Sequence, residues 1–289
     1  MSGLRFAVIG LGLIGGSLAR ALRSAGAVSS VSAFDTDLCQ RRLALELGIV
    51  DDAPDSAAAA VAQAELVVLA VPVLHTAQAL RSCLPGLKAG AVVTDVGSTK
   101  QSVLTDVAAV CGSLPPWFVA GHPIAGTEKS GVAHALADLF HNRRVILTPH
   151  AAQDAAALQR VSAMWVATGA RVVHMDPAQH DAVFAATSHL PHLLAYSFVD
   201  MLARLDAQDE IFPNAGGGFR DFTRIASSSP EMWHDIVRAN AGPVSRLLEQ
   251  QIGELREVLA MMREGRWDEV RTLFERARSA RERHLAQIE

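Results

Sequence analysis

Residues 4–17 read Leu4-Arg-Phe-Ala-Val-Ile-Gly10-Leu-Gly12-Leu-Ile-Gly15-Gly16-Ser17. The apolar run up to Ile9 is typical of a buried parallel strand, and residues 18–24 are predicted to be helical. Glycines between a strand and a helix allow a tight turn and let a pyrophosphate approach the positive N-terminus of the helix. The stretch therefore predicts a dinucleotide-binding fold at the start of the chain.

A second expected strand, residues 28–34, ends at Asp35, which lies 20 residues after Gly15. A carboxylate there bonds the ribose 2′-hydroxyl of NAD and repels the 2′-phosphate of NADP, so Asp35 favours NAD. An ordinary turn residue is the competing interpretation, because Asp37 follows closely. We expect the cofactor to contact the loop, Asp35 and the ends of two later strands, through Gly10, Gly12, Leu13, Ile14, Gly15, Asp35, Val71, Pro72 and Ser98.

The rest of the chain divides into two patterns. Apolar runs alternate with helical stretches and predict further strands at residues 66–71, 91–95, 143–148 and 171–175. From residue 176 the apolar spacing becomes helical and stays so to the end. We therefore predict an α/β Rossmann-type domain over residues 1–175 and an all-α domain over residues 176–289. Apolar stripes, such as Val244 to Met262, indicate a face shared with a second subunit in a homodimer.

Composition excludes several classes of protein. The chain has 289 residues, half of them apolar, and a net charge of −4, which gives nucleic acid no basic surface to bind. The three cysteines lack the spacing of a disulfide framework or a zinc site, so we expect a reducing cytoplasm and no metal. Residues 6–18 imitate a secretory signal, but cleavage there would remove the glycine loop. No apolar run is long enough for a membrane helix.

His122 is the strongest catalytic candidate. It stands between Gly121 and Pro123, in an expected turn after the short apolar lead of residues 117–120. Such a turn would place the imidazole at the sheet edge where open α/β sheets bind ligands. Because histidine exchanges a proton near neutral pH, we predict that His122 is the general base of a dehydrogenase. A lone histidine that only fills a loop is the alternative.

The predicted strand that ends at Asp95 leads into Val96-Gly-Ser98-Thr-Lys100. This turn is expected at the same sheet edge as the glycine loop, so Ser98, Thr99 and Lys100 are placed near the nicotinamide. Ser98 is expected to hydrogen-bond His122 or a substrate hydroxyl. Capping of the following helix is an equally good interpretation and is compatible with the first.

Two stretches of the helical part are unusual. Pro191 should kink its helix, and Ser188 and His192 flank the kink on one face, either as the wall of a cleft or as caps for the disturbed backbone. No cysteine or carboxylate completes a metal set with the histidines there. Farther on, residues 216–218 are three glycines that predict an irregular loop, followed by Arg220 and Arg224. These arginines are either a substrate-carboxylate anchor or solvated surface groups, and the adjacent glycines favour the anchor.

Taken together, these motifs resemble the prephenate/arogenate (cyclohexadienyl) dehydrogenase family of tyrosine biosynthesis. The resemblance covers nearly the whole chain and rests on residues 10–15, 95–100, 121–128, 188–192 and 216–224. It implies a Rossmann domain followed by a helical dimerisation domain. It also implies NAD-dependent oxidative decarboxylation of prephenate to 4-hydroxyphenylpyruvate, or of arogenate to tyrosine.

The resemblance further implies residue roles. His122 resembles the residue that polarises the ring hydroxyl, with Ser98 bonded beside it, and Arg224 resembles the anchor of a substrate carboxylate. The remaining implied residues line the cleft (Thr127, Glu128, Ser188, His192), shape the pocket loop (Gly217, Asp221) or reach the neighbouring subunit's site (His180, Met232, Trp233).

Two other functions stay open at this point. A β-hydroxyacid or imine reductase shares the architecture, but such enzymes typically place a lysine on the helical domain, and this chain has none after Lys129. A non-catalytic NAD-sensing regulator would keep the fold, yet it would leave the set of His122, Ser98 and Arg224 unexplained.

Overall fold

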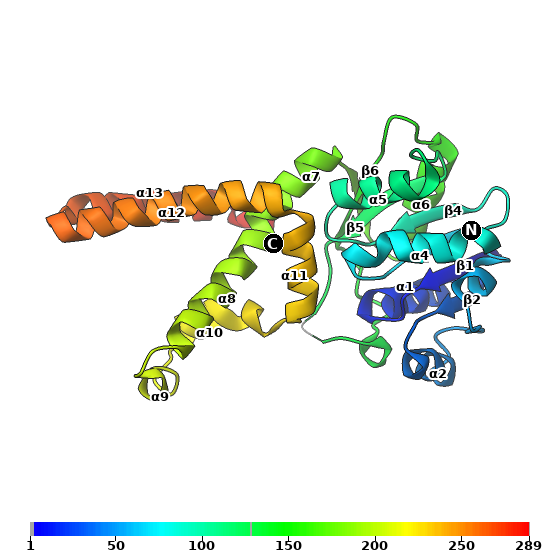
Figure 1. Cartoon of the computed structure of the whole chain (residues 1–289), viewed down its shortest axis with the longest axis horizontal. Helices are drawn as coiled ribbons and strands as arrows, with labels where there is room; N and C mark the ends of the chain where they lie inside the picture. Colours follow the sequence, from blue (N-terminus) through cyan, green and yellow to red (C-terminus); the bar gives the residue numbers. More distant parts are fainter. Residues whose placement is uncertain (1–2, 128, 289) are drawn as a thin grey trace. The chain divides into compact units, whose positions relative to one another are not determined.

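The computed structural model describes residues 3–127 and 129–288, so Glu128 lies outside the described residues. The chain forms two compact units, Met1–Ala241 and Gly242–Glu289. The first unit contains the sheet and most of the helices (Figure 1). Among the described residues, no helix is both long and apolar enough to cross a membrane.

The described strands form one seven-stranded sheet in the order β2-β1-β3-β4-β5-β6-β7. Neighbouring strands are parallel except for the antiparallel pair β5–β6. The strands are β1 (Leu4–Ile9), β2 (Val28–Phe34), β3 (Leu66–Leu69), β4 (Val92–Asp95), β5 (Phe118–Pro123), β6 (Arg144–Thr148) and β7 (Arg171–His174). The chain order reverses at β1, so the carboxyl ends of β1 and β3 open the crevice in which such sheets bind ligands.

Helices cover both faces of this sheet (Figure 1). Alternate residues of β1 enter different cores, since Phe6 and Val8 pack on one face while Ala7 and Ile9 pack on the other. The first core is closed by α1 (Leu13–Ser24), α2 (Leu38–Glu46) and α6 (Ala155–Ala167), and the second by α3 (Ala57–Val61), α4 (Thr76–Cys83) and α5 (Gln101–Cys111). Burial on both faces explains why the strands are apolar at nearly every position. The predicted α/β class is confirmed.

After β7 the described chain is helical. The elements are α7 (Pro177–Phe184), a π-helical turn (Ala185–His189), α8 (Leu190–Ala203), α9 (Gln208–Ile211), α10 (Gly217–Thr223), α11 (Pro230–Ala239), α12 (Ala241–Glu264) and α13 (Trp267–Ile288). The disturbance predicted at Pro191 appears one turn earlier, as the π-helical turn. The reason is that proline offers no N–H to the carbonyl four residues before it. The domain boundary at residue 176 stays a prediction.

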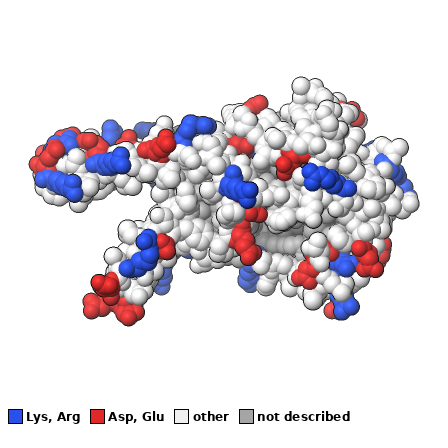
Figure 2. All heavy atoms as spheres, viewed as in Figure 1, with Lys and Arg blue, Asp and Glu red and all other residues white. Residues whose placement is uncertain are grey.

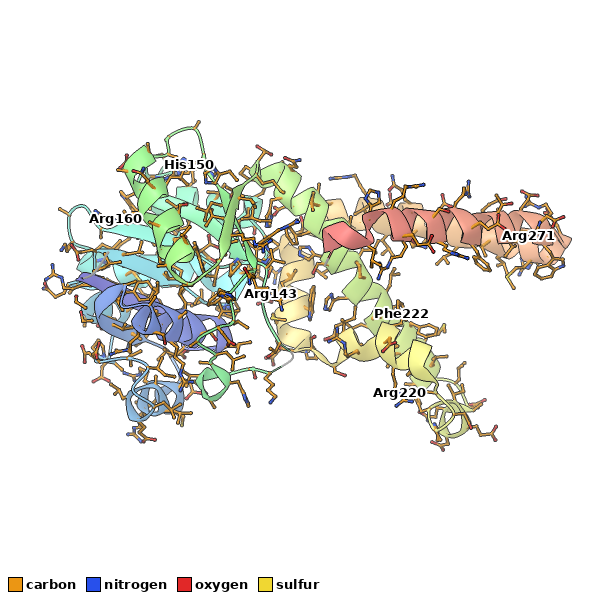
Figure 3. All side chains as sticks on the ribbon, turned by 180° about the vertical axis from the view of Figure 1, so that it is seen from behind. Arg143, His150, Arg160, Arg220, Phe222 and Arg271 are labelled. Atoms are coloured by element: carbon orange, nitrogen blue, oxygen red, sulfur yellow. The ribbon has the colours of Figure 1, made fainter. Side chains whose placement is uncertain are left out.

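The three glycines at residues 216–218 do not form the predicted loop. Gly216 is the N-cap of α10, and Gly217 and Gly218 are its first residues. Glycine is among the residues favoured at an N-cap, where the backbone is not yet helical, so the triplet can begin a helix. Arg220 and Phe222 project from the same helix (Figure 3).

The apolar stripe of α12 is exposed within a single chain. Ile252, Leu255, Leu259 and Met262 are all exposed, while Val244 at the start of the stripe is buried. On the face shown in Figure 2, acidic and basic side chains are interspersed. A row of exposed large apolar side chains marks a surface that packs against another protein.

The glycine loop yields a stability prediction. Gly10 has φ +101°, and a β-carbon there would overlap the carbonyl of Ala70, whereas a β-carbon on Gly12 would meet nothing within 4 Å. We expect Gly10→Ala to lower the free energy of unfolding by at least about 1–2 kcal/mol through backbone strain alone. Gly12→Ala should cost less than about 1 kcal/mol, as a helix N-cap change. Urea unfolding of the two variants without cofactor makes the comparison, and equal losses would contradict it.

Candidate active site

The glycine loop joins β1 to α1 at the crevice. A β-carbon on Gly15 would overlap the carbonyl of Gly10, so this glycine allows α1 to pack closely on the strand, while the space beside Gly12 is open. Leu13 is buried in the core and Ile14 is half-buried. Of Leu13, only the backbone N–H at the start of α1 is therefore available to a ligand.

Asp35 lies directly beside this loop. Its carboxylate accepts hydrogen bonds from the backbone N–H of Leu11 (2.6 Å) and of Asp37 (2.8 Å). Asp35 therefore does act as a turn residue. Its hydrogen bonds hold the carboxylate against the glycine loop. Asp37 has a separate function, because its side chain caps α2 by accepting a hydrogen bond from the N–H of Cys39. The fixed position of Asp35 is suited to a ribose hydroxyl in the crevice.

Val71 and Pro72 follow β3 at the same edge of the sheet. A cavity of about 600 Å³ lies between this segment and α11. It is lined by Pro72, His75, Ser229, Pro230, Glu231, Met232, His234 and Asp235. The fold thus brings the predicted cofactor residue Pro72 close to the predicted cleft residue Met232.

His122 lies in a strand and not in the predicted turn. It belongs to β5, where it pairs with Ile146 of the antiparallel strand β6. The frame of Gly121 and Pro123 is strand-compatible because Pro123 is the last residue of β5, where a missing N–H costs little. Since β4 and β5 are parallel, His122 still lies near the sheet edge that carries the glycine loop.

The His122 side chain contacts residues that follow the sheet in sequence. Its Nδ1 is 2.9 Å from Nε2 of His180, and the His180 Nδ1 is 2.8 Å from Oδ1 of Asp181. The ring of Phe184 packs edge-on against the imidazole of His122 at a centroid distance of 4.8 Å. His122, His180 and Asp181 are all buried.

Burial controls the charge of these histidines. Desolvation, together with repulsion from His180, Lys100 and His189, holds the pKa of His122 well below its ordinary value of 6.5. Burial also lowers the pKa of His180, although the hydrogen bond to Asp181 opposes this shift. His122 is therefore a neutral imidazole at neutral pH, as a group that accepts a proton must be.

Ser98 makes neither of the two contacts within the chain that the sequence suggested, the bond to His122 and the cap of α5. In the described part of the chain, no hydrogen bond joins it to His122, whose Nδ1 is occupied by His180. Nor does Ser98 cap α5: the backbone N–H groups of Lys100 and Gln101 instead donate to the carboxylate of Asp181, at 2.7 and 2.9 Å. The capping group thus comes from α7, a partner that no local sequence pattern reveals. Ser98 is half-buried at the sheet edge, and its side chain stays a candidate contact for cofactor or substrate.

Lys100 was predicted near the nicotinamide, but its side chain is buried inside the protein. It is fully buried, and its Nζ lies 2.5 Å from Oδ2 of Asp95 and 2.5 Å from the carbonyl of Gly121. Asp95 also accepts hydrogen bonds from the N–H groups of Gly97 (2.8 Å) and Gly121 (3.0 Å). This ion pair joins the end of β4 to the residue before His122. Thr99 is buried beside it and bonds Ser102, 2.6 Å between the hydroxyl oxygens.

A second group of ring side chains lies on the helices α8 and α11. His192 Nδ1 is 2.9 Å from the carbonyl of Ser188, so this pair makes the backbone-capping contact that was one of its two interpretations. The His192 ring stacks on Trp233 with centroids 3.5 Å apart. Asn240, which the sequence did not point to, donates to the carbonyl of Asp181 (2.8 Å) and lies 3.0 Å from Nδ1 of His189.

Most of the other residues implied by the resemblance are exposed. Arg224 follows α10 and lies close enough to His192 that its charge, after burial, contributes to the lowered pKa of His192. Thr127 accepts a hydrogen bond from the N–H of Lys129 (3.2 Å). Gly217, Asp221 and Met232 are exposed on α10 and α11, while Trp233 is buried under His192. Within the described residues, no group of three or more His, Cys, Asp or Glu side chains is arranged to hold a metal ion.

Comparison with known proteins agrees with this arrangement. A family model described as "Prephenate dehydrogenase, nucleotide-binding domain" matches residues 18–174, and one described as "Prephenate dehydrogenase, dimerization domain" matches residues 176–276. The prephenate dehydrogenase of Bacillus subtilis is 39% identical over 254 residues, which are 86% of this chain and 67% of the relative. The cyclohexadienyl dehydrogenase of Zymomonas mobilis is 36% identical over 255 residues, 87% of this chain and 86% of the relative.

Solved structures extend the similarity. The prephenate dehydrogenase of Aquifex aeolicus in complex with hydroxyphenyl propionate and NAD⁺ superposes with a TM-score of 0.91 at 33% identity, covering 100% of this chain and 99% of that one. The arogenate dehydrogenase of Synechocystis gives a TM-score of 0.80 at 26% identity, with 97% and 100% coverage. A 3-hydroxyisobutyrate dehydrogenase, at 16% identity and a TM-score of 0.52, shares the fold alone. The chain thus belongs to the prephenate dehydrogenase family.

Proposed function

We propose that this protein catalyses the NAD-dependent oxidative decarboxylation of prephenate to 4-hydroxyphenylpyruvate, of arogenate to tyrosine, or of both. The observation that carries the proposal is the buried, neutral His122 at the end of β5, beside the crevice of a dinucleotide-binding sheet. Membership of this family favours a dehydrogenase over both a β-hydroxyacid or imine reductase and a non-catalytic sensor.

The crevice fits NAD. Space is open beside Gly12, the N-terminus of α1 faces it, and Asp35 is held against the loop. The α1 N–H groups suit the pyrophosphate, and the carboxylate of Asp35 suits the ribose hydroxyls. When bound, NAD⁺ supplies the acceptor for the hydride that leaves the ring carbon of the substrate.

The residues of the chain accept and return the proton and hold the substrate in position. His122 accepts the proton of the ring hydroxyl as that carbon is oxidised, because its imidazole is neutral. Arg224 is suited to hold a substrate carboxylate with two parallel hydrogen bonds. Loss of the ring carboxylate as CO₂ leaves its electron pair in the ring, which becomes aromatic, and the ring oxygen then takes a proton back from His122. Most of the acceleration comes from positioning and from this base.

The assembly proposed is a homodimer formed by the helical part. The second matched model is a dimerization domain, and the apolar stripe on α12 is exposed within one chain. A second copy would cover Leu255 and Leu259, whose exposure in water is otherwise unfavourable.

The activity is tested by NADH formation with prephenate and, separately, with arogenate. His122→Asn should lower kcat by about 10²–10⁴, because the base is lost, and should leave NAD binding nearly unchanged. His174→Asn, a change at an exposed histidine of β7, is the matched control and should behave as the wild type. Absence of NADH formation with either substrate would contradict the proposed function, and an equal loss of NAD affinity in His122→Asn would contradict the role of His122.

Arg224→Ala is expected mainly to raise KM, since an anchor that binds substrate and transition state alike affects binding more than turnover. Arg204→Ala, at an exposed arginine directly after α8 that is not part of the candidate site, provides the control. Steady-state kinetics on both variants decide the matter. An unchanged KM in Arg224→Ala would remove the anchor role.

The pH dependence follows from the lowered pKa of His122. A base works only when it is deprotonated, so activity falls as the pH drops through the pKa of that base. Because the pKa of His122 lies well below 6.5, kcat/KM should stay level from pH 8 down to pH 6.5 and decline only at more acidic pH. A profile of kcat/KM against pH, measured with saturating NAD⁺, checks this, and an acid limb centred at or above pH 6.5 would be inconsistent with a buried neutral base.

A further inference from the structure

His122 is joined to two further buried polar side chains, and the three form a line of hydrogen-bonded groups. It runs from His122 Nδ1 to His180 Nε2 (2.9 Å) and from His180 Nδ1 to Asp181 Oδ1 (2.8 Å). His180 and Asp181 are the fourth and fifth residues of α7, whereas His122 lies on β5. The three side chains are therefore brought together only by the packing of α7 on the sheet.

We propose that His180 and Asp181 are positioning residues that hold His122 as the tautomer with its proton on Nδ1, which leaves Nε2 as the atom that accepts the substrate proton. The inference rests on the proposed function and assigns the proton-accepting atom within it. His180 acts through His122 in this account and does not itself touch the reacting atoms.

The ionised carboxylate of Asp181 determines which group donates and which accepts in each hydrogen bond of the line. Burial alone would raise the pKa of its carboxyl, but hydrogen bonds from His180 and from the backbone N–H groups of Lys100 and Gln101 lower it, so the group is ionised. An ionised carboxylate only accepts hydrogen bonds. The Nδ1 of His180 must therefore be the donor in its 2.8 Å contact with Asp181.

The tautomers of both histidines follow. Burial lowers the pKa of His180 and of His122, so each ring is neutral and carries one N–H. Because the proton of His180 is on Nδ1, its Nε2 is an acceptor. The Nδ1 of His122 must then donate to it, and Nε2 of His122 keeps a bare lone pair.

Asp181, at the end of this line, is held by further hydrogen bonds. Asp181 caps α5 with both carboxylate oxygens, and Asn240, at the end of α11, donates to its backbone carbonyl at 2.8 Å. Phe184 packs against both imidazoles, with centroid distances of 4.8 Å to His122 and 4.5 Å to His180. Its ring covers the line with apolar surface, which limits the replacement of His180 by water as the partner of His122.

The neighbouring charges do not provide a competing partner. The amine of Lys100 is bound to Asp95 and to the carbonyl of Gly121, and His189 faces Asn240. A protonated lysine can only donate hydrogen bonds. If the amine of Lys100 contacted Nδ1 of His122, the proton of that ring would have to be on Nε2. Of the described contacts of His122, the hydrogen bond to His180 is the one that fixes where its proton lies.

The test is the position of the His122 proton, read by ¹⁵N-edited NMR of the imidazole nitrogens in the full chain, with the His122 signals assigned by their loss in His122→Asn. The wild type should show His122 protonated on Nδ1 and bare on Nε2. His180→Leu should lose this signature, and its kcat should fall by about 10²-fold with KM and NAD affinity close to those of the wild type. A proton on Nε2 of wild-type His122 would overturn the proposal.

His189→Leu is the matched control, because it removes another buried histidine of the same region that bonds Asn240 and not His122. It should leave the His122 signature in place, whereas loss of that signature in both variants would indicate a general structural effect and would overturn the specific role of His180. If His180→Leu does not fold, the wild-type spectrum alone decides. Since the spectrum requires no substrate, a correct tautomer without turnover would refute the proposed function and leave the positioning intact.

Discussion

The buried ion pair between Lys100 and Asp95 is the interaction on which the geometry of the site depends. Removing two charges from water is costly unless every remaining hydrogen-bonding position is filled. Here the backbone supplies much of this compensation: Asp95 accepts hydrogen bonds from the N–H groups of Gly97 and Gly121, and Lys100 donates to the carbonyl of Gly121. Gly121 is thus held on both its N–H and its C=O, and the next residue is His122. The charges at the end of β4 thus also hold the backbone next to His122, the proposed base.

The same charges tune the chemistry. Burial makes a proton on His122 unfavourable, and the nearby amine of Lys100 adds to this effect. In the proposed reaction His122 would therefore start unprotonated, and it would need no other group to remove its proton first. Asp181 complements this arrangement, because its carboxylate both caps α5 and orients His180. One buried acid thus serves the stability of the nucleotide-binding half and the orientation of the base.

The sequence predicted what depends on local pattern. The apolar runs identified the strands of the sheet, and the glycine spacing located the crevice beside α1. The errors have a common cause, since they involve partners that are distant in the chain. The cap of α5 comes from Asp181, 81 residues after Lys100, so Ser98 does not make the capping contact that was one of its interpretations. His122 was placed in a turn because glycine and proline flank it, but pairing with β6 makes that segment a strand. The family resemblance singled out His180 as a residue that reaches the neighbouring subunit's site, which stays a prediction, but it did not reveal the contact with His122 within this chain.

The central claim is that one molecule is held between the base on β5 and the guanidinium that follows α10. The most direct measurement is a crystal structure of the protein with NAD⁺ and 4-hydroxyphenylpyruvate bound. The account predicts that the phenolic oxygen lies about 2.6–3.2 Å from Nε2 of His122, while the side-chain carboxylate of the same molecule meets Arg224. A ligand whose hydroxyl faces away from His122, or whose carboxylate is bound without Arg224 from either subunit, would contradict it.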